Sequence, residues 1–192
     1  MYDYNGQNIS DRIKNREVIA DCQFADCTFE NCRFDDCTFE NCTFSECKFI
    51  KCSITNMRTE NTEFKFAVFV KCTLVGINWL KLQNGSVAFP VEKFEKCYLK
   101  YNEFDKMNLK KFDFMQSNIV DCAFANCNLC ESNFSDCDLK NTQFYNCNLK
   151  KADFRNATGY DINLAENRVK GAVFSSREAV RLLSPFEIKI VD

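Results

Sequence analysis

Cysteine is the residue type in this sequence whose number and spacing could do chemistry. Its fourteen thiols could bind zinc, form disulfides or act as nucleophiles. Seven of them recur every five residues, at Cys22, Cys27, Cys32, Cys37, Cys42, Cys47 and Cys52. Thirteen of the fourteen share one slot of this period, which elsewhere holds Ala67, Ala152, Ala157, Ala172, Ser117, Ser132, Thr62 and Thr142. A slot shared by these residue types favours small volume, so we interpret the cysteines as buried, reduced core residues.

Other signs of chemistry are missing from the sequence. It contains no histidine and no paired C-x₂-C, so it predicts no metal site. It has no glycine-rich phosphate loop and no G-x-S-x-G, so we expect no cofactor, no small-molecule substrate and no catalytic residues. Cys130 lies outside the small slot and is predicted to point outward. It is either a reactive thiol or an ordinary exposed cysteine, and we prefer the second interpretation because no histidine can activate it.

The elements that would hold these cysteines follow the same period. Two residues after the small slot comes a central slot, and from Phe24 to Phe174 large apolar residues fill 28 of its 31 positions. The exceptions are Thr59, Asn84 and Gly159. Two residues in five therefore face inward, and the other three face outward or form a corner. A period of five fits neither a helix nor an alternating strand, so the pattern predicts a solenoid.

Units such as Cys22-Gln23-Phe24-Ala25-Asp26 and Ala152-Asp153-Phe154-Arg155-Asn156 resemble the pentapeptide-repeat family. The resemblance covers roughly residues 19–174. It implies an all-β fold, a right-handed quadrilateral β-helix of about eight coils, in which four pentapeptides make one 20-residue coil. Successive coils of such a helix would stack at the strand spacing of about 4.8 Å.

Three segments depart from the repeat. Residues 1–18 lack it and are expected to form an N-terminal cap over the first coil. Residues 80–93 interrupt it as a loop or a distorted coil. This segment is either a local irregularity without function or a partner-binding loop, whose candidate residues are Leu82, Asn84, Gly85 and Phe89.

Residues 175–192 are expected to form a helix and a strand. Ser175 and Glu178 have the spacing of a capping box, and Phe186-Glu187-Ile188-Lys189-Ile190-Val191 alternates as a strand. The tail resembles that of the Qnr-type quinolone-resistance subgroup, in which it joins two subunits. The resemblance implies a homodimer, with an interface made by Leu182, Leu183, Phe186, Ile188 and Ile190. The alternative is a monomer in which the tail caps the last coil.

Bulk composition indicates an ordinary soluble chain. The net charge is −2, and no apolar run approaches 18 residues, so we expect no membrane span. The N-terminus lacks the pattern of a signal peptide, and the expected location is cytoplasmic. The charges are nevertheless segregated. The first coils carry a candidate acidic surface of Asp21, Asp26, Asp35, Asp36, Glu40 and Glu46.

A candidate basic face follows from the expected coil length. Residues that share a number modulo 20 should stack, which places Lys48, Lys51 and Lys71 in line with Lys110, Lys111, Lys150 and Lys151. This alignment requires residues 80–93 to complete a whole number of turns.

Three functions are compatible with these features. The resemblance implies a non-enzymatic DNA-shaped protein that binds a type II topoisomerase, DNA gyrase or topoisomerase IV, and protects it from quinolones. The lysine-rich face instead favours an acidic partner. Direct binding of nucleic acid is not expected, because no aromatic platform is interleaved with the basic residues. The third is a structural solenoid whose partner the sequence does not indicate.

Overall fold

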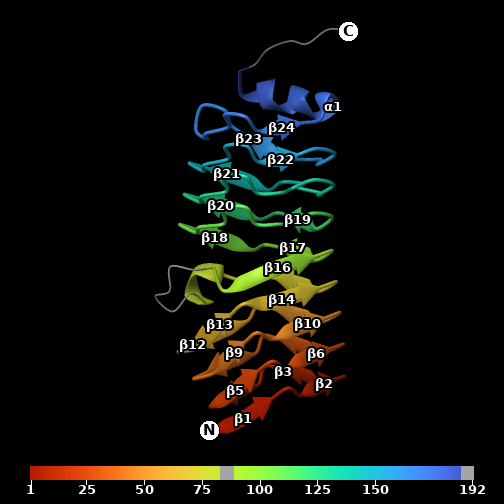
Figure 1. Cartoon of the computed structure of the whole chain (residues 1–192), viewed down its shortest axis with the longest axis vertical. Helices are drawn as coiled ribbons and strands as arrows, with labels where there is room; N and C mark the ends of the chain where they lie inside the picture. Colours follow the sequence, from red (N-terminus) through yellow and green to blue (C-terminus); the bar gives the residue numbers. More distant parts are fainter. Residues whose placement is uncertain (83–88, 187–192) are drawn as a thin grey trace.

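The computed structural model describes residues 1–82 and 89–186 as a straight rod of stacked coils (Figure 1). The chain enters at one end of the rod and reaches the other after about eight turns. Every pair of neighbouring strands is parallel, and most pairs join residues 20 positions apart, such as Phe24 with Phe44. The expected quadrilateral β-helix is therefore confirmed.

Each coil has four sides, which we call A, B, C and D in chain order. Side A contains β1 (Tyr2–Asn5), β5 (Cys22–Ala25), β9 (Thr43–Ser45) and β13 (Glu63–Lys65). Side B contains β2 (Asn8–Ser10), β6 (Thr28–Glu30), β10 (Lys48–Ile50), β14 (Ala67–Val70) and β16 (Val91–Glu95), followed nearer the C-terminus by β22 (Asp153–Phe154) and β24 (Val173–Phe174).

Sides C and D complete the square. Side C contains β3 (Ile13–Asn15), β7 (Arg33–Asp35), β11 (Ser53–Thr55), β15 (Thr73–Val75), β17 (Tyr98–Lys100) and β19 (Asn118–Val120). Side D contains β4 (Val18–Ala20), β8 (Thr38–Glu40) and β12 (Arg58–Glu60), then the 3₁₀ turn η1 (Trp79–Leu82), and then β18 (Glu103–Asp105), β20 (Ala123–Ala125), β21 (Gln143–Tyr145) and β23 (Asp161–Ile162).

The corners explain why polar residues recur in the last slot of each unit. The corner residues have positive φ, as Asn41 does at 52° and Asn61 at 47°. Asparagine and aspartate tolerate this left-handed conformation better than other residues with a side chain. They also bond to one another along the rod, because the Asn61 amide donates to Asn41 over 3.2 Å and Asn41 donates to Asp21 over 3.2 Å.

The central slots form the core, as the sequence predicts. Rings stack from coil to coil, with centroids 4.9 Å apart for Phe24 and Phe44 and 4.5 Å apart for Phe44 and Phe64. In the other half of the rod, Phe104 and Phe124 stack at 4.5 Å. Offset stacking of this kind adds to the free energy gained by burying the rings.

Residues 1–18 differ from the expectation of a segment without the repeat. They form the strands of a complete coil, with Tyr4 paired to Phe24 and Ile9 paired to Phe29. Lys14 occupies a central slot there and pairs with Phe34. A coil needs backbone pairing on each side but not a phenylalanine in each slot, so a degenerate sequence still adds a turn to the rod.

The interruption near residue 80 lengthens one coil by five residues. Across it, Phe69 pairs with Phe94 and Leu74 pairs with Leu99, an offset of 25 positions instead of 20. The chain leaves the side-D stack through η1 and returns as β16, with a β-bulge between Ala67 and Val68. The interruption is thus a distorted coil. The five-residue frame continues through it, but each later unit lies on a side of the rod one earlier than a repeat of 20 residues would give.

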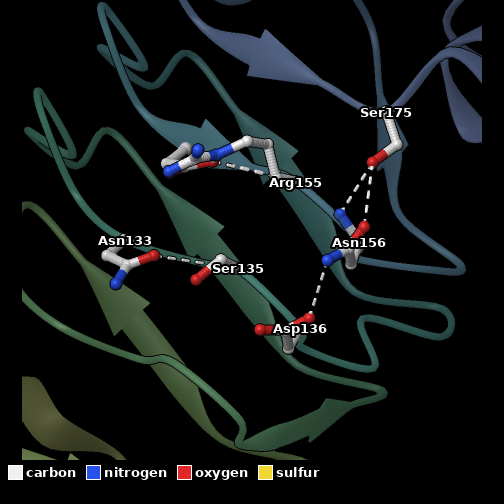
Figure 2. A network of polar contacts seen from close by, with 7 residues as sticks. Asn133, Ser135, Asp136, Arg155, Asn156 and Ser175 are labelled. Carbon is white, nitrogen blue, oxygen red and sulfur yellow. Dashed lines mark hydrogen bonds and ion pairs between the residues drawn. The ribbon is translucent and has the colours of Figure 1, made fainter.

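The C-terminal end is closed by α1 (Ser176–Ala179) and the 3₁₀ turn η2 (Val180–Phe186). The expected capping box does not form, because Ser175 makes no side-chain bond to the helix. Its hydroxyl instead accepts a hydrogen bond from the Asn156 backbone N–H over 2.8 Å, and Asn156 donates to Asp136 over 3.0 Å (Figure 2). Glu178 accepts from the Gly159 N–H over 3.3 Å. Both side chains therefore attach the tail to the last coils.

Gly159, an exception in the central slot, is also accounted for. The next residue, Tyr160, is buried, and its ring lies 5.8 Å from Phe154 and 5.6 Å from Phe174. To accommodate it, side D pairs Phe144 with Ile162, a shortened offset of 18.

Candidate functional site

The thirteen cysteines of the small slot are buried, as expected. Burial raises the pKa of Cys47 to about 11 and those of Cys122 and Cys137 to about 12. The corresponding thiols are protonated at neutral pH, which makes them poor nucleophiles and poor metal ligands. In the part of the chain that the structure describes, no three metal-binding side chains converge.

The small slot has a second property that the sequence interpretation missed. Most of its thiols donate to a backbone carbonyl of the coil before, as Cys47 does to Phe24 over 3.4 Å. Thr62 makes the same bond to Phe39 over 2.9 Å, and Ser132 makes it to Leu109 over 2.7 Å. Small volume therefore governs this slot, and at the Cys, Ser and Thr positions a hydrogen-bond donor is added to it. The shared chemistry of Cys, Ser and Thr is the signal that could have revealed it.

Cys130 is the one cysteine that is not fully buried. On side A, the outward residues two positions before the row of Cys130 pair from coil to coil: Asn108 with Asn128, Asn128 with Asn148, and Asn148 with Arg168. Cys130 therefore lies in the outward row of Lys110, Lys150 and Lys170. This placement agrees with its predicted outward direction.

The predicted basic face is not continuous: its earlier and later lysines lie on different sides of the rod. Lys48 lies on β10 of side B, and Lys51 and Lys71 follow at the corner between B and C. The 25-residue offset moves the later lysines to side A. The sequence interpretation depended on a whole number of turns in residues 80–93, and the extra pentapeptide breaks that condition.

The later lysines do form one surface, which we call the basic half-face. It consists of the outward and corner side chains of side A after the distorted coil, and its exposed basic residues are Lys106, Lys110, Lys111, Lys150, Lys151, Arg168 and Lys170. The acids in it are Glu131, which pairs with Lys111 over 3.8 Å, and Glu166.

The same side of the rod is acidic before the distorted coil. We call this part the acidic half-face; it comprises the outward residues of β1, β5, β9 and β13 and the two corners beside them. Its charged residues are Asp3, Asp21, Asp26, Glu46, Glu63 and Lys65. Lys65 pairs with Glu63 over 2.9 Å, so the net charge remains strongly negative.

The structure divides the predicted acidic surface. It brings together Asp21, Asp26 and Glu46, and it places Glu40 on the adjoining side D. Asp35 and Asp36 lie instead on side C and its far corner, where Asp35 pairs with Arg33 and Asp36 lies 4.0 Å from Arg16. These two are not part of the acidic half-face. Asp3 and Glu63 belong to it and were missed, because the sequence grouped the acids by coil and not by side.

Two residues of the proposed binding loop face the core. Leu82 is buried, and Phe89 is half-buried with its ring 5.3 Å from Phe112. Neither is therefore placed to contact a partner. Asn84 and Gly85 lie outside the described residues.

The proposed dimer residues are only partly visible. Leu182 is buried within its own chain and Leu183 is half-buried, which fits a cap over the last coil. Phe186 ends η2, and Ile188 and Ile190 lie outside the described residues. The expected strand after residue 186 also lies there. The dimer therefore stays a prediction, and Leu182 is removed from its expected interface.

Comparison with known proteins agrees with this architecture. The model of the pentapeptide repeat region matches residues 22–92, 89–164 and 117–179. The chain belongs to the pentapeptide-repeat family. No curated protein sequence matches this pentapeptide-repeat protein. Within the described ranges, no helix is long and apolar enough to cross a membrane.

Solved structures resemble it at the level of the fold. One is HetL from the cyanobacterium Nostoc, a pentapeptide repeat protein involved in heterocyst differentiation regulation, with a TM-score of 0.58 and 11% identity over 88% of this chain and 86% of that one. Another is trypsin-treated QnrB1, a plasmid-mediated fluoroquinolone resistance protein, with a TM-score of 0.35 and 16% identity over 98% and 100% of the two chains. The likeness to HetL shows a common fold and leaves function open.

Proposed function

We propose that this protein is a non-enzymatic scaffold that binds a type II topoisomerase by presenting the acidic half-face in place of DNA. The observation that supports the proposal is the collection of five carboxylates and one paired lysine on one side of a straight rod. A DNA-binding groove attracts such a surface because its basic side chains normally meet phosphates. The Qnr-type resemblance of the repeat units and tail supports DNA gyrase or topoisomerase IV as the partner.

Binding, and not catalysis, suits the rest of the surface. Catalysis needs groups that converge in a hollow protected from water. The thiols of the small slot face the core, and the carboxylates of the acidic half-face lie on the outside of the rod, open to water. These groups can position charge for a partner, whereas they do not surround a reacting atom.

The test is gyrase supercoiling with and without a quinolone, titrated with the purified protein. The wild type should protect or inhibit the enzyme at micromolar levels or below. A variant with Asp21→Asn, Asp26→Asn and Glu46→Gln should require at least about tenfold more protein, because it removes three carboxylates from the surface that meets the groove.

A matched control removes the same number of carboxylates from other sides of the first coils. Asp11→Asn, Asp36→Asn and Glu30→Gln lie on side B and at the corners next to side C; Asp11 and Asp36 are left-handed corners, whereas all three substituted residues of the test variant are. This control should act like the wild type. Equal loss in both variants, or no effect of the wild type on either topoisomerase, would refute the proposal.

The basic half-face supports a second candidate, an acidic protein partner. Lys110, Lys150 and Lys170 share one outward row, and Lys111 and Lys151 stand at the next corner. Fluorescence anisotropy with a labelled polyglutamate peptide tests this candidate. Binding should weaken as salt rises and should be lost when Lys110, Lys111, Lys150 and Lys151 are changed to glutamate.

The earlier lysines, which lie on a different side of the rod from the basic half-face, provide the control for this second candidate. Changing Lys48, Lys51 and Lys71 to glutamate should leave polyglutamate binding unchanged, because these residues lie on side B and its corner. Loss of binding in both variants would indicate a general charge effect. A labelled DNA duplex that bound more tightly than the peptide would indicate a nucleic-acid partner instead.

An end-to-end homodimer through residues 183–192 is also a proposal. It is supported by the apolar tail sequence, Leu183, Phe186, Ile188 and Ile190. Sedimentation equilibrium should give twice the chain mass for the full protein and a single chain mass after truncation at residue 186. A monomeric full-length chain would leave the tail as a cap alone.

A further inference from the structure

Phe66 is a phenylalanine in a place where the fold disfavours one. It stands at the corner between sides A and B with a φ of 53°, and 56% of its surface is exposed. The same corner in the earlier coils holds Gly6, Asp26 and Glu46. A bulky side chain in the left-handed region is uncommon, and such outliers cluster at binding sites.

The ring of Phe66 takes no part in the core. It makes no ring or cation contact with another residue in the described ranges, whereas the phenylalanines of the central slots stack on one another. Folding therefore does not account for an aromatic side chain at this corner. Asparagine, which several other corners use, would satisfy the backbone with less strain.

A shallow hollow of about 560 Å³ lies beside Phe66. It lies where the chain changes register, next to the β-bulge between Ala67 and Val68. Bulges frequently re-aim side chains next to functional sites. The hollow is lined by Asp26, Glu46, Lys48, Phe66, Val68 and Glu92.

Charge and shape together define what the hollow would accept. Its lining contains three carboxylates and one lysine, and the exposed ring and Val68 supply the apolar surface. A guanidinium group suits both features, because it stacks on an aromatic face and pairs with carboxylates. An ammonium group lacks the planar surface for stacking.

We propose that this hollow docks an arginine-bearing segment of a protein partner, with Phe66 as its aromatic anchor. Aromatic residues and arginine dominate the binding energy of protein interfaces, usually where an apolar anchor is ringed by polar groups. The proposal rests on the geometry of the hollow and applies to any protein partner. It shares Asp26 and Glu46 with the topoisomerase proposal, but its test contains no topoisomerase, so the two can fail separately.

Tyr101 provides a matched comparison within the same chain. It is also an exposed aromatic corner residue, with a φ of 55° and 57% exposure. Its ring, however, is already covered by Lys100, whose Nζ lies 4.7 Å from the ring centroid. Tyr101 should therefore not accept an external cation.

The experiment is chemical-shift mapping of the ¹⁵N-labelled protein with N-acetyl-Leu-Arg-Leu-amide. Saturable shifts should be centred on Phe66, Val68 and Glu46, with a dissociation constant of about 1 mM, as expected for one small contact site. The peptide with citrulline in place of arginine keeps the shape without the charge and should bind at least about tenfold more weakly.

Variants separate binding from folding. Phe66→Asn should abolish the shifts while melting at or above the wild-type temperature, because asparagine suits the corner. Glu46→Gln should weaken binding without changing the ring, and Tyr101→Asn should leave binding intact. Absence of saturable shifts, unchanged binding in Phe66→Asn, or equal loss in Tyr101→Asn would overturn the proposal. If Phe66→Asn did not fold, unchanged peptide binding in Glu46→Gln would overturn the proposal.

Discussion

The thiol of Cys47 donates a hydrogen bond to the carbonyl oxygen of Phe24, 23 residues earlier in the chain and one coil below, over 3.4 Å. The bond joins two consecutive coils inside the rod, where water cannot replace it. A buried carbonyl without a donor costs free energy of the order of a hydrogen bond. The small slot therefore links the coils as well as providing room for them.

Substitutions at Cys47 test the two requirements of this slot. Cys47→Ser keeps both the donor and the size, and we expect it to change the free energy of unfolding by less than about 1 kcal/mol. Cys47→Ala loses the donor and should cost about 1–2 kcal/mol. Cys47→Leu should cost about 1–3 kcal/mol or more, because it overpacks the interior. Urea unfolding measures all three, and Cys130→Ala is the surface control. An alanine variant as stable as the serine variant would show that volume alone matters.

The raised thiol pKa values predict how stability depends on pH. A thiol whose folded pKa lies above its unfolded value contributes stability below the unfolded pKa, near 8.5, and loses it as pH rises through the folded pKa. With Cys47 at about 11 and Cys122 at about 12, the midpoint of unfolding should fall steadily between about pH 8.5 and 12. A Cys47→Ser variant should show a shallower fall in the same titration.

Thiol reactivity gives an independent measurement of the same burial. At pH 8, a colorimetric thiol reagent should react rapidly with Cys130 alone in the folded protein and with all fourteen cysteines in denaturant. A Cys130→Ala variant should show no rapid reaction. Rapid reaction of several thiols in the native state would contradict the packed core.

The phenylalanine stack should carry much of the stability. Phe124 is fully buried, and its ring lies 4.5 Å from that of Phe104 and 5.1 Å from that of Phe144. We expect Phe124→Ala to cost about 3–5 kcal/mol through the cavity it leaves. Phe124→Leu should cost less, because leucine occupies the central slot in other coils, as Leu129 does. Thermal or urea unfolding measures both variants. A loss of less than about 1 kcal/mol in the free energy of unfolding of Phe124→Ala would contradict the prediction.

The repeat predicted the fold because one physical constraint acts in every unit. Phe24 and its successors must enter a square interior, and the residues two places earlier must be small, so side-chain type alone shows which positions face inward. Residues 1–18 escaped this logic. Lys14 does not look like the repeat, but backbone pairing to β7 holds its part of the coil in place, as pairing to β6 holds Ile9.

The surface was less predictable for a different reason. An insertion of five residues preserves the frame of Phe69 and Phe94, so the sequence pattern continues while the later side chains lie one side earlier than a strict count of 20 predicts. The position of Lys110 relative to Lys48 therefore depends on a count that periodicity cannot reveal. The capping box failed similarly, because Ser175 and Glu178 find partners in the last coils that local spacing does not indicate.

Asn156 tests the contribution of the corner ladders. It has a φ of 60°, and its amide donates to Asp136 over 3.0 Å. Asn156→Ala should cost about 2 kcal/mol, because it loses that bond and places a methyl group in a disfavoured conformation. Asn156→Gly keeps the freedom of the backbone and should cost about 1 kcal/mol less. Equal losses for the two variants, measured by urea unfolding, would show that backbone strain is unimportant at this corner.

Lys51 offers the opposite change, a substitution expected to stabilise the rod. It stands in the same row of corners as Asn31, with a φ of 52°. Among the described residues it makes one ion pair, an exposed one with Glu30 at 4.0 Å, which contributes little in water. Lys51→Asn should relieve the left-handed lysine and extend the amide ladder from Asn31, raising the free energy of unfolding by about 0.5–1 kcal/mol. Lys48→Asn is the control, since Lys48 lies in a strand without positive φ and should gain nothing. If both variants shifted the urea midpoint equally, the gain would come from removing positive charge and not from the geometry of the corner.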